Sequence, residues 1–332
     1  MRKQPFFSII IPTYNRAHCI EFAINSVLDQ TINDFEIIVV DDGSTDGTEL
    51  LLEQYGDQVR YFYQQNSGVS EARNLGIKNA HGQWVAFLDS DDEWMPEKLS
   101  IQYEAILLDN NIVISVTDCL IVEGDDSLSL FSIRGYTPEA SPFQIITEPL
   151  CTIARLQFFT PSVIIDKDIL VKAGLFDINM RLYEDLDLFL RVATFGALVV
   201  TPKKLVKVFN RGDVSLSSTQ EHISFHGPAA SVKTYYKLLN DYSLNHREEI
   251  FLKNRLSGNR FRLGFEQIKN KIFIEGFKNI IQSFNDDRGV KSFFRCVLFF
   301  ITLGLGIILL NKIKSVKNGS YKRSNYSKGK GN

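Results

Sequence analysis

Short apolar runs alternate with helix-like patterns along the first part of this chain, and this alternation limits its possible folds more than any other feature. The runs are too short and too rich in β-branched and aromatic residues to be buried helices, so they predict strands. They cover residues 7–11, 35–40, 59–63 and 84–88. Strands that alternate with helices predict an α/β fold with a doubly wound, mostly parallel, Rossmann-like sheet and right-handed crossovers.

Helical spacing marks the segments between these runs. Apolar residues recur at helical spacing from Ile20 to Leu28. Asp46 is placed to cap a helix that contains Leu50 to Leu52, and Ser70 is placed to cap one that runs to Ala80. Further along, the patterns predict a helix over 96–108, a strand over 112–122, a loop over 124–142, a second structured block over 143–209 and a helical extension over 228–284.

The composition excludes several classes of protein. The chain has 44% hydrophobic residues, 9 Pro and nearly balanced charge, with 37 Lys+Arg and 39 Asp+Glu, which excludes disorder, collagen and a polytopic membrane protein. No secretory signal is visible at the N-terminus. The cysteines form no C-x-x-C pair and no zinc-site spacing with His, so they predict buried thiols in a reducing compartment; they are Cys19, Cys119, Cys151 and Cys296.

The C-terminal end combines an apolar run with a basic tail. Residues 312–332 carry seven Lys or Arg and no acidic residue, whereas the rest of the chain has 30 basic and 39 acidic residues. The apolar run at 296–310 falls short of the roughly 20 residues that a spanning helix needs, and it has basic residues on both sides. We expect a re-entrant or interfacial anchor reinforced by the tail. A buried core helix followed by a solvated tail is the alternative.

Polar and acidic residues follow three of the predicted strands, at 12–15, 41–44 and 89–92. In open α/β sheets, ligands bind beyond the carboxyl ends of the strands. Carboxylates that lie so close repel one another unless a cation compensates, and Mg²⁺ and Mn²⁺ prefer oxygen ligands. The sequence therefore predicts a divalent metal site at this edge, with a solvated acidic turn as the alternative.

Four motifs occur in a characteristic order: FSIIIPTYNR from Phe7, SVLDQTINDFEIIVVDDGSTDGT from Ser26, NSGVSEARNLGI from Asn66 and GQWVAFLDSDDEWMPEKL from Gly82. In this order and spacing they resemble the family 2 glycosyltransferases, which have the GT-A fold. The resemblance is strong over residues 6–100 and moderate over 160–200. It implies transfer of a sugar from a nucleotide-sugar in bacterial polysaccharide assembly.

The resemblance implies which residues bind the nucleotide. Pro12, Thr13 and Tyr14 correspond to the loop that cradles the base, with Tyr14 placed to stack on it. Asp42 corresponds to the carboxylate that accepts a hydrogen bond from the uracil ring N–H, and Asp41 is a neighbouring contact. The structural alternatives are that Tyr14 plugs the edge of the sheet and that Asp41 caps the turn at Gly43.

The resemblance also implies a metal motif. Asp89, Ser90 and Asp91 match the family's Asp-x-Asp, in which Asp89 and Asp91 hold Mn or Mg and Asp91 is the more direct ligand, while Asp89 and Ser90 border the nucleotide. Arg73 matches a basic residue near the base and phosphates. The alternative for Arg73 is an ion pair with Glu71 or Asp92.

A Glu-Asp pair in the second half is the catalytic candidate. Glu184 and Asp185 resemble the family's pair at the start of a helix, where the amino-terminal end stabilises negative charge. In inverting members the Asp is the general base, which assigns that role to Asp185. Helix capping by either residue is the alternative.

One departure from the family pattern concerns the loop that closes over the diphosphate. Relatives often carry an Arg and a His before Ser-x-Ser, whereas this chain reads NRGDVSLSS from Asn210. Arg211 is therefore the candidate diphosphate contact, and the His is absent.

Together these patterns predict a metal-dependent, inverting glycosyltransferase in the cytoplasm, associated peripherally or monotopically with the inner face of the cell membrane. The expected donor is a UDP-sugar and the expected acceptor is a saccharide or a lipid-linked acceptor. Nucleic acid is not an expected partner, because few aromatic residues interleave the basic tail. The alternatives are a transferase that uses a polyprenyl phosphate as acceptor and a non-catalytic nucleotide-sugar-binding subunit.

The predicted organisation has four parts. The GT-A domain covers 1–220, with the nucleotide-sugar and metal half at 1–110 and the acceptor half at 111–220. A helical accessory segment follows at 221–290, an apolar membrane-associated segment at 291–311 and a basic disordered tail at 312–332.

Overall fold

The computed structural model describes residues 4–209, 226–287, 289, 292, 295–299 and 301–302. Contacts within the chain divide it into two compact units, Met1–Phe251 and Leu252–Asn332. Arg211, the basic tail at 312–332 and most of the apolar segment at 291–311 lie outside the described residues. No helix in the described ranges is both long and apolar enough to cross a membrane.

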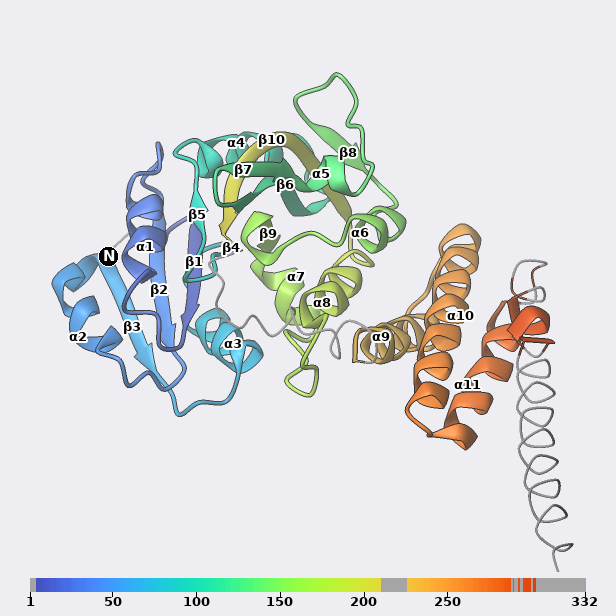
Figure 1. Cartoon of the computed structure of the whole chain (residues 1–332). Coiled ribbons are helices and arrows are strands. Elements are labelled where there is room, and N and C mark those ends of the chain that lie inside the picture. The colour runs from blue at the N-terminus through green and yellow to red at the C-terminus, as the bar shows by residue number, and fades with distance from the viewer. Residues whose placement is uncertain are drawn as a thin grey trace, which may run out of the picture. The chain divides into compact units, whose positions relative to one another are not determined.

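A single mixed sheet runs through the first unit (Figure 1). Its strands are β1 Phe7–Thr13, β2 Phe35–Asp41, β3 Val59–Tyr63, β4 Trp84–Phe87, β5 Glu93–Trp94, β6 Ile112–Glu123, β7 Asp126–Ser129, β8 Gln144–Ile146, β9 Val163–Asp166 and β10 Ala197–Phe209. They lie in the order β3-β2-β1-β4-β9-β6-β10-β5, with β7 beside β6 and β8 beside β10. The predicted α/β fold is therefore confirmed.

The sheet is parallel where the alternating pattern is clearest. Strands β3, β2, β1 and β4 are parallel neighbours, and β6 is parallel to β10. The strand β9 lies antiparallel between β4 and β6 and joins these two parallel regions. Because β1 and β2 pair in register from Phe7 with Phe35 to Thr13 with Asp41, their carboxyl ends meet at one edge.

Helices cover both faces of the parallel region. Ile9 and Ile11 belong to the core that contains the buried side of α1, whereas Ile10 contacts α3 on the opposite face, because side chains alternate along a strand. At the α3 contact, a Cβ on Gly76 would lie 2.5 Å from Cγ2 of Ile10. The helices of this unit are α1 Ile20–Leu28, α2 Thr48–Leu52, α3 Val69–Asn79, α4 Lys98–Ile106, α5 Leu130–Ile133, α6 Leu150–Leu156, α7 Lys167–Lys172, α8 Glu184–Val192 and α9 Gly227–Asp241, with 3₁₀ turns η1 Glu53–Gln58 and η2 Thr160–Ser162.

Some local predictions differ from the structure. The residue before α3 is Gly68, with φ +94°, rather than the expected Ser70. The residue before α2 is Gly47, with φ +89°, rather than the expected Asp46, although Asp46 accepts hydrogen bonds from Thr48. Both glycines adopt conformations that a side chain disfavours. The expected loop at 124–142 contains β7 and α5, because Asp118 on β6 accepts hydrogen bonds from Ser129 and Phe131.

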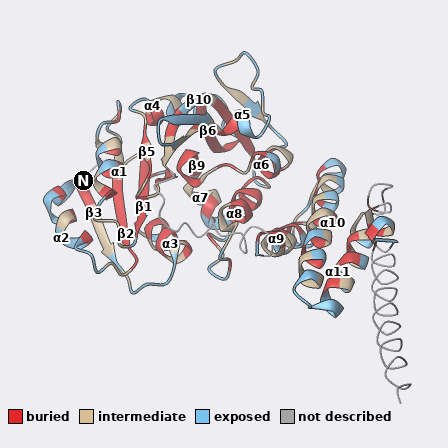
Figure 2. Ribbon diagram, in the orientation of Figure 1, coloured by how far each residue is buried: buried red, intermediate tan, exposed pale blue. Residues whose placement is uncertain are grey.

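The second unit is helical, as predicted. It contains α10 His246–Lys269 from Leu252 onward and α11 Phe273–Asp286. Ile280, Cys296 and Phe299 form its buried cluster, with partly buried phenylalanines around them. Figure 2 shows buried residues through the sheet of the first unit and exposed residues along the outer sides of the helices.

The four cysteines are free thiols. Cys19, Cys119 and Cys296 are buried as predicted, while Cys151 on α6 is half-buried. Burial raises the pKa of the Cys119 thiol well above its ordinary value, which keeps this group protonated and unreactive.

Candidate active site

The residues expected to cradle the base lie where β1 ends beside β2. The backbone N–H of Asp42 donates to the Thr13 carbonyl at 2.8 Å, which fixes the two segments against each other. The Thr13 side chain is buried, and its hydroxyl has no hydrogen-bond partner in the described part of the chain. Tyr14 is 48% exposed, so its ring is accessible rather than plugged into the sheet edge.

Both carboxylate oxygens of Asp41 accept hydrogen bonds from other groups of the protein. Its Oδ1 accepts from the Ser44 N–H at 2.7 Å, and its Oδ2 accepts from the Tyr61 hydroxyl at 3.0 Å. Burial and the nearby Asp41 carboxylate raise the pKa of Tyr61, so the hydroxyl keeps the proton it donates. The structure thus shows the turn-capping role that the sequence left open for Asp41.

Asp42 holds the loop that leads into α3. Its Oδ1 accepts from the Gln64 side-chain amide at 2.7 Å and from the Ser67 N–H at 2.8 Å, and its Oδ2 accepts from the Gly68 N–H at 2.8 Å. The side chain is only 5% exposed. The sequence indicated Asp42 only as a contact of the nucleotide base and did not indicate that it stabilises this loop.

Arg73 on α3 joins the two motifs that carry the proposed chemistry. One terminal nitrogen donates to Oδ1 of Asp89 at 2.8 Å, and the other donates to Oε1 of Glu184 at 3.1 Å. The guanidinium also lies over the Phe176 ring, at 5.3 Å from its centroid. The side chain is buried, and its Nε has no partner among the described residues. The partners are therefore Asp89 and Glu184, not the Glu71 or Asp92 considered from the sequence.

Asn74 fixes the same junction through the backbone. Its side-chain amide donates to the Phe176 carbonyl at 2.9 Å and accepts from the Phe176 N–H at 3.0 Å. The Phe176 ring packs edge-on against Phe87 of β4, with centroids 5.4 Å apart. These contacts hold the segment that precedes α8 against α3 and β4.

Asp185 lies in the first turn of α8. The residue before the helix is Tyr183, with φ +58° and no side-chain capping bond, while Oδ1 of Asp185 accepts from the Leu186 N–H at 2.7 Å. Burial, followed by the charge of Glu184, raises the pKa of Asp185 to about 7, although the Leu186 N–H and Arg73 act in the opposite direction. A carboxyl group with this pKa is poised to exchange a proton near neutral pH.

A buried ion pair on α8 holds this helix against the segment at 173–175 and against α9. Arg191 contacts Asp187 at 2.7 Å with both side chains 2% exposed, and it donates to the carbonyls of Ala173 and Leu175. Asp187 also accepts from the Thr234 hydroxyl of α9 at 3.1 Å. Sequence reasoning missed this pair, although its signal was present as an Asp and an Arg four residues apart on an otherwise apolar helix.

The Asp-Ser-Asp motif follows β4. Asp91 is half-buried, with Oδ2 3.8 Å from Nε of Arg16, and Ser90 is buried with its carbonyl 3.5 Å from the Cys19 thiol. The next residue, Asp92, accepts from the Phe209 N–H at the end of β10. The motif is thus tied to the second half of the sheet.

The metal prediction concerns Asp89 and Asp91. No three acidic, His or Cys side chains gather into a metal site in the part of the chain that the structure describes. Two carboxylates nevertheless suit Mg²⁺ or Mn²⁺, since such ions take the remaining ligands from water and substrate phosphates. The donor chemistry of these residues therefore fits the predicted ion.

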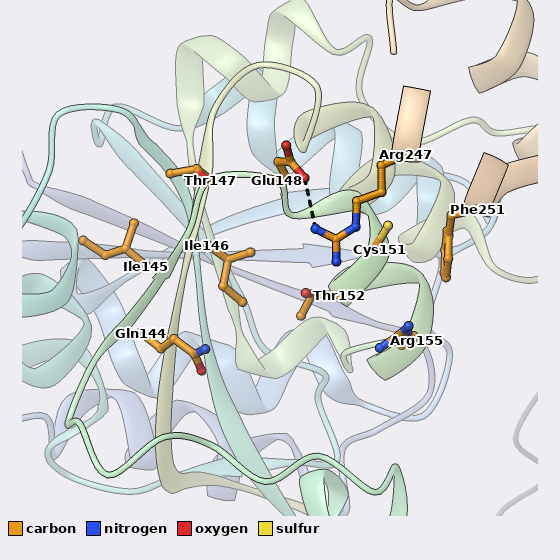
Figure 3. A pocket seen from close by; sticks show the side chains of 10 residues that line it. All are labelled: Gln144, Ile145, Ile146, Thr147, Glu148, Cys151, Thr152, Arg155, Arg247 and Phe251. Atoms are coloured by element: carbon orange, nitrogen blue, oxygen red, sulfur yellow. Dashed lines mark ion pairs between the residues drawn. The ribbon is translucent and has the colours of Figure 1, made fainter. Parts of the chain in front are cut away.

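A separate cavity of about 540 Å³ lies in the first unit between β8, α6 and the first turns of α10. Figure 3 shows Arg247 reaching toward Glu148 across it, at 3.6 Å, with Arg155 near Phe251. None of the predicted site residues lines this cavity. It is therefore distinct from the group of residues around Arg73.

Comparisons with known proteins bear on the family and the fold. Residues 8–154 match the model of Glycosyl transferase family 2. An uncharacterized glycosyltransferase of Rickettsia typhi is 36% identical over 207 residues, which cover 61% of this chain and 63% of that protein. WfgD of Escherichia coli, a UDP-Glc:alpha-D-GlcNAc-diphosphoundecaprenol beta-1,3-glucosyltransferase, is 41% identical over 107 residues, which cover 32% of this chain and 42% of WfgD.

Among solved structures, S. aureus TarS 1–349 in complex with UDP has a TM-score of 0.62 at 21% identity, over 84% of this chain and 79% of that one. The first unit therefore has the GT-A type of α/β fold. With the motifs at the sheet edge, the match over 8–154 identifies a family 2 glycosyltransferase domain in this chain. The match spans less than two thirds of the length of these curated relatives.

Proposed function

We propose that this protein is an inverting glycosyltransferase that moves a sugar from a UDP-sugar to a hydroxyl of a saccharide or lipid-linked acceptor in cell-surface polysaccharide synthesis. The observation that carries the proposal is the pair of hydrogen bonds from Arg73 to Asp89 and Glu184. Through them the Asp-Ser-Asp motif and the Glu-Asp pair form one ionic group around the buried Arg73. The names of WfgD and of the UDP-bound TarS structure support the donor class and a lipid-linked acceptor.

Asp185 is the general base in this proposal. The acceptor hydroxyl oxygen attacks the anomeric carbon from the face opposite the diphosphate, and Asp185 takes the hydroxyl proton as the new C–O bond forms. The bond from the anomeric carbon to the diphosphate oxygen breaks, and its electron pair leaves with that oxygen. A pKa of about 7 makes Asp185 a stronger base than an ordinary Asp while part of it remains ionised at neutral pH.

The donor would lie along the edge from β1 to β4. Tyr14 is accessible for stacking on the base, and the Thr13 hydroxyl and the Arg73 Nε are buried polar atoms there that have no hydrogen-bond partner among the described residues. Asp42 would accept from the base, and Pro12, Asp41 and Ser90 would shape the surrounding walls.

Asp91 and Asp89 would hold the divalent ion. When bound, Mn or Mg would neutralise charge on the departing diphosphate. Arg73, through its bond to Asp89, keeps that carboxylate in place. Arg211 is proposed as a further diphosphate contact and lies outside the described residues.

The same proposal includes the predicted boundaries between the parts of the chain at residues 220, 290 and 311. It also includes association with the cytoplasmic face of the membrane through residues 291–311 and the basic tail. Deleting residues 293–332 tests the anchor. The deleted protein should bind UDP normally and sediment with lipid less than the full-length chain. Unchanged sedimentation would show that residues 293–332 contribute nothing to membrane binding.

The test of the catalytic proposal separates binding from transfer. Calorimetric titration of UDP, with Mn²⁺ and with a chelator, should give binding that requires the ion in wild type and in D185N, and that is weakened in D91N. Transfer from a UDP-sugar should fall roughly 10²-fold or more in D185N if Asp185 is the base.

The matched control is D168N, which makes the same change at an exposed carboxylate in the first turn of α7. It should behave as wild type in both assays. Equal transfer by D185N and wild type would remove Asp185 from the mechanism, and folded protein that binds no UDP under any condition would remove the donor assignment.

A further inference from the structure

The end of the turn between α10 and α11 and the first turn of α11 expose three bulky apolar residues in succession. Ile272, Phe273 and Ile274 are 40%, 52% and 80% exposed. All residues from 269 to 275 are exposed, and Figure 2 shows this turn in the exposed colour. Large apolar side chains that gather on a surface indicate contact with another molecule or a membrane. We call residues 272–274 the apolar tip.

The apolar tip is left outside because the two helices close on each other beside it. A Cβ on Gly264 of α10 would lie 2.6 Å from the Gly276 carbonyl of α11, and one on Gly276 would lie 2.6 Å from Cγ1 of Ile268. Ile280, one turn further along α11, is fully buried. The helix pair thus completes its own contact with small residues and Ile280, and it does not use the apolar tip.

The backbone of the turn is well defined. The Ile272 N–H donates to the Gln267 carbonyl at 2.8 Å and the Lys271 N–H to the Ile268 carbonyl at 3.0 Å, while Lys271 has φ +65°. This is the Schellman arrangement that ends a helix, and its left-handed residue is usually glycine. The Gly276 N–H then donates to the Ile272 carbonyl, so the apolar tip leads directly into α11.

Charge on this unit has the opposite sign to the rest of the chain. Even without residues 293–332, residues 252–292 contain 9 Lys or Arg against 4 Asp or Glu, whereas residues 1–251 contain 20 against 35. Lys269, Lys271 and Lys278 flank the apolar tip. Lys269 is paired with Glu266 at 3.1 Å, and Glu275 lies beside the tip. A surface with exposed apolar side chains among lysines complements anionic lipid, in which the side chains enter the acyl boundary and the ammonium groups meet the headgroups.

We infer that the apolar tip inserts into the surface of an anionic membrane. Ile281 extends this contact, because it lies two turns from Ile274 on the same side of α11, is 55% exposed and has Lys278 between. The contact is formed by residues other than 293–332 and does not depend on the glycosyl transfer proposed above. It gives the second unit a lipid contact of its own, built from a rigid helical turn.

The test places a reporter in the apolar tip of the full-length chain. The protein has two tryptophans, Trp84 and Trp94, and both are buried in the first unit, so wild type supplies the background. In the F273W variant, vesicles of phosphatidylglycerol should shift the added emission to the blue, and brominated acyl chains should quench it. Vesicles of phosphatidylcholine should do neither, and about 0.5 M salt should weaken the response, since the charge contribution is screened.

Substitution supplies the second measurement. Changing all three tip residues to serine should lower the vesicle partition coefficient at least tenfold, whereas the control L107S/L108S, at two exposed leucines of the first unit, should leave it unchanged. Vesicle binding of F273W without quenching would overturn the inference, because the bound protein would then hold the apolar tip in water. A blue shift that grows with protein concentration in the absence of lipid would overturn it in favour of a second copy of this chain, and a response to RNA but not to vesicles would do so in favour of nucleic acid.

Discussion

Replacing Arg73 by Met should destabilise the first unit and should do so less at acidic pH. The substitution removes a buried cation that contacts Asp89 at 2.8 Å and Glu184 at 3.1 Å. Methionine fills a similar volume without charge. The carboxylates of Asp89, Glu184 and Asp185 would then face one another with no cation between them.

The distances set the expected magnitude. At an effective dielectric constant of about 20, these two contacts correspond to roughly 6 and 5 kcal/mol of attraction, most of which offsets the cost of burying the guanidinium. Breaking a buried ion pair by removing one partner costs about 3 to 5 kcal/mol. Asp89 is 33% exposed, so solvent screens its share, and we expect a loss near 3 kcal/mol.

The pH dependence follows from Asp185. Its pKa is already raised to about 7, and Arg73 is one of the groups that hold it down. Without Arg73 the pKa rises further, so the folded variant takes up a proton more readily than wild type. Because protonation removes the uncompensated charge, the stability gap between R73M and wild type should be smaller at pH 5.5 than at pH 7.5.

Urea unfolding followed by tryptophan fluorescence measures this effect in the relevant part of the chain, because Trp84 and Trp94 both lie in the first unit. The matched control is R247M, which removes an arginine whose side chain is 82% exposed and which lies 3.6 Å from Glu148. Such surface pairs contribute about 0 to 1 kcal/mol. If R73M loses no more unfolding free energy than R247M, Arg73 does not stabilise the contact between the Asp-Ser-Asp motif and the Glu-Asp pair.

Three further changes test other features. The value of kcat/KM should rise with pH and level off above about 7, because Asp185 accepts a proton only when ionised; a profile that is flat from pH 5 to 8 would exclude it as the base. D187A should lower the free energy of unfolding by about 3 to 5 kcal/mol in the same urea assay, since it leaves Arg191 buried without its carboxylate; a loss below about 1 kcal/mol would show that the pair is dispensable. Burial lowers the pKa of Lys98 to about 7, and its side-chain nitrogen lies 2.7 Å from Oε1 of Gln102, so wild type should gain stability as the pH rises from 7 toward 10. The K98M variant should lack this gain and be the more stable protein at pH 7. Parallel pH profiles of stability for the two proteins would contradict a lowered pKa of Lys98.

Local patterns predicted the parallel part of the fold well. The strand expected over 59–63 has the observed bounds of β3, and those expected at 7–11, 35–40 and 84–88 differ from β1, β2 and β4 only near their carboxyl ends. Each of these runs is mostly apolar and rich in β-branched or aromatic residues, so its own composition determines its structure. The segments at 126–129 and 130–133 were expected to be loop, because they gain their structure from Asp118 on a neighbouring strand.

The candidate site was predictable as a set of residues and not as an arrangement. The family motifs indicated Asp89, Glu184 and Asp185 one by one. The bond between Arg73 and Glu184 joins residues 111 positions apart, and no local pattern encodes such a contact. The sequence did not indicate the glycines as the residues before α2 and α3, because Asp46 and Ser70 are conventional capping residues. Only the backbone shows the positive φ at Gly47 and Gly68.

The three hydrogen bonds that Asp42 accepts have a consequence for the choice among nucleotides. A carboxylate offers about four acceptor positions, and the loop from Gln64 to Gly68 fills three of them, two on Oδ1 and one on Oδ2. The remaining position on Oδ2 can receive one donor. If Asp42 meets the base through a ring nitrogen, as proposed, uracil and guanine can donate to it from a ring N–H. Cytosine and adenine carry a lone pair at the corresponding ring nitrogen and could donate only from an exocyclic amino group. UDP and GDP should therefore compete for this site far better than CDP and ADP.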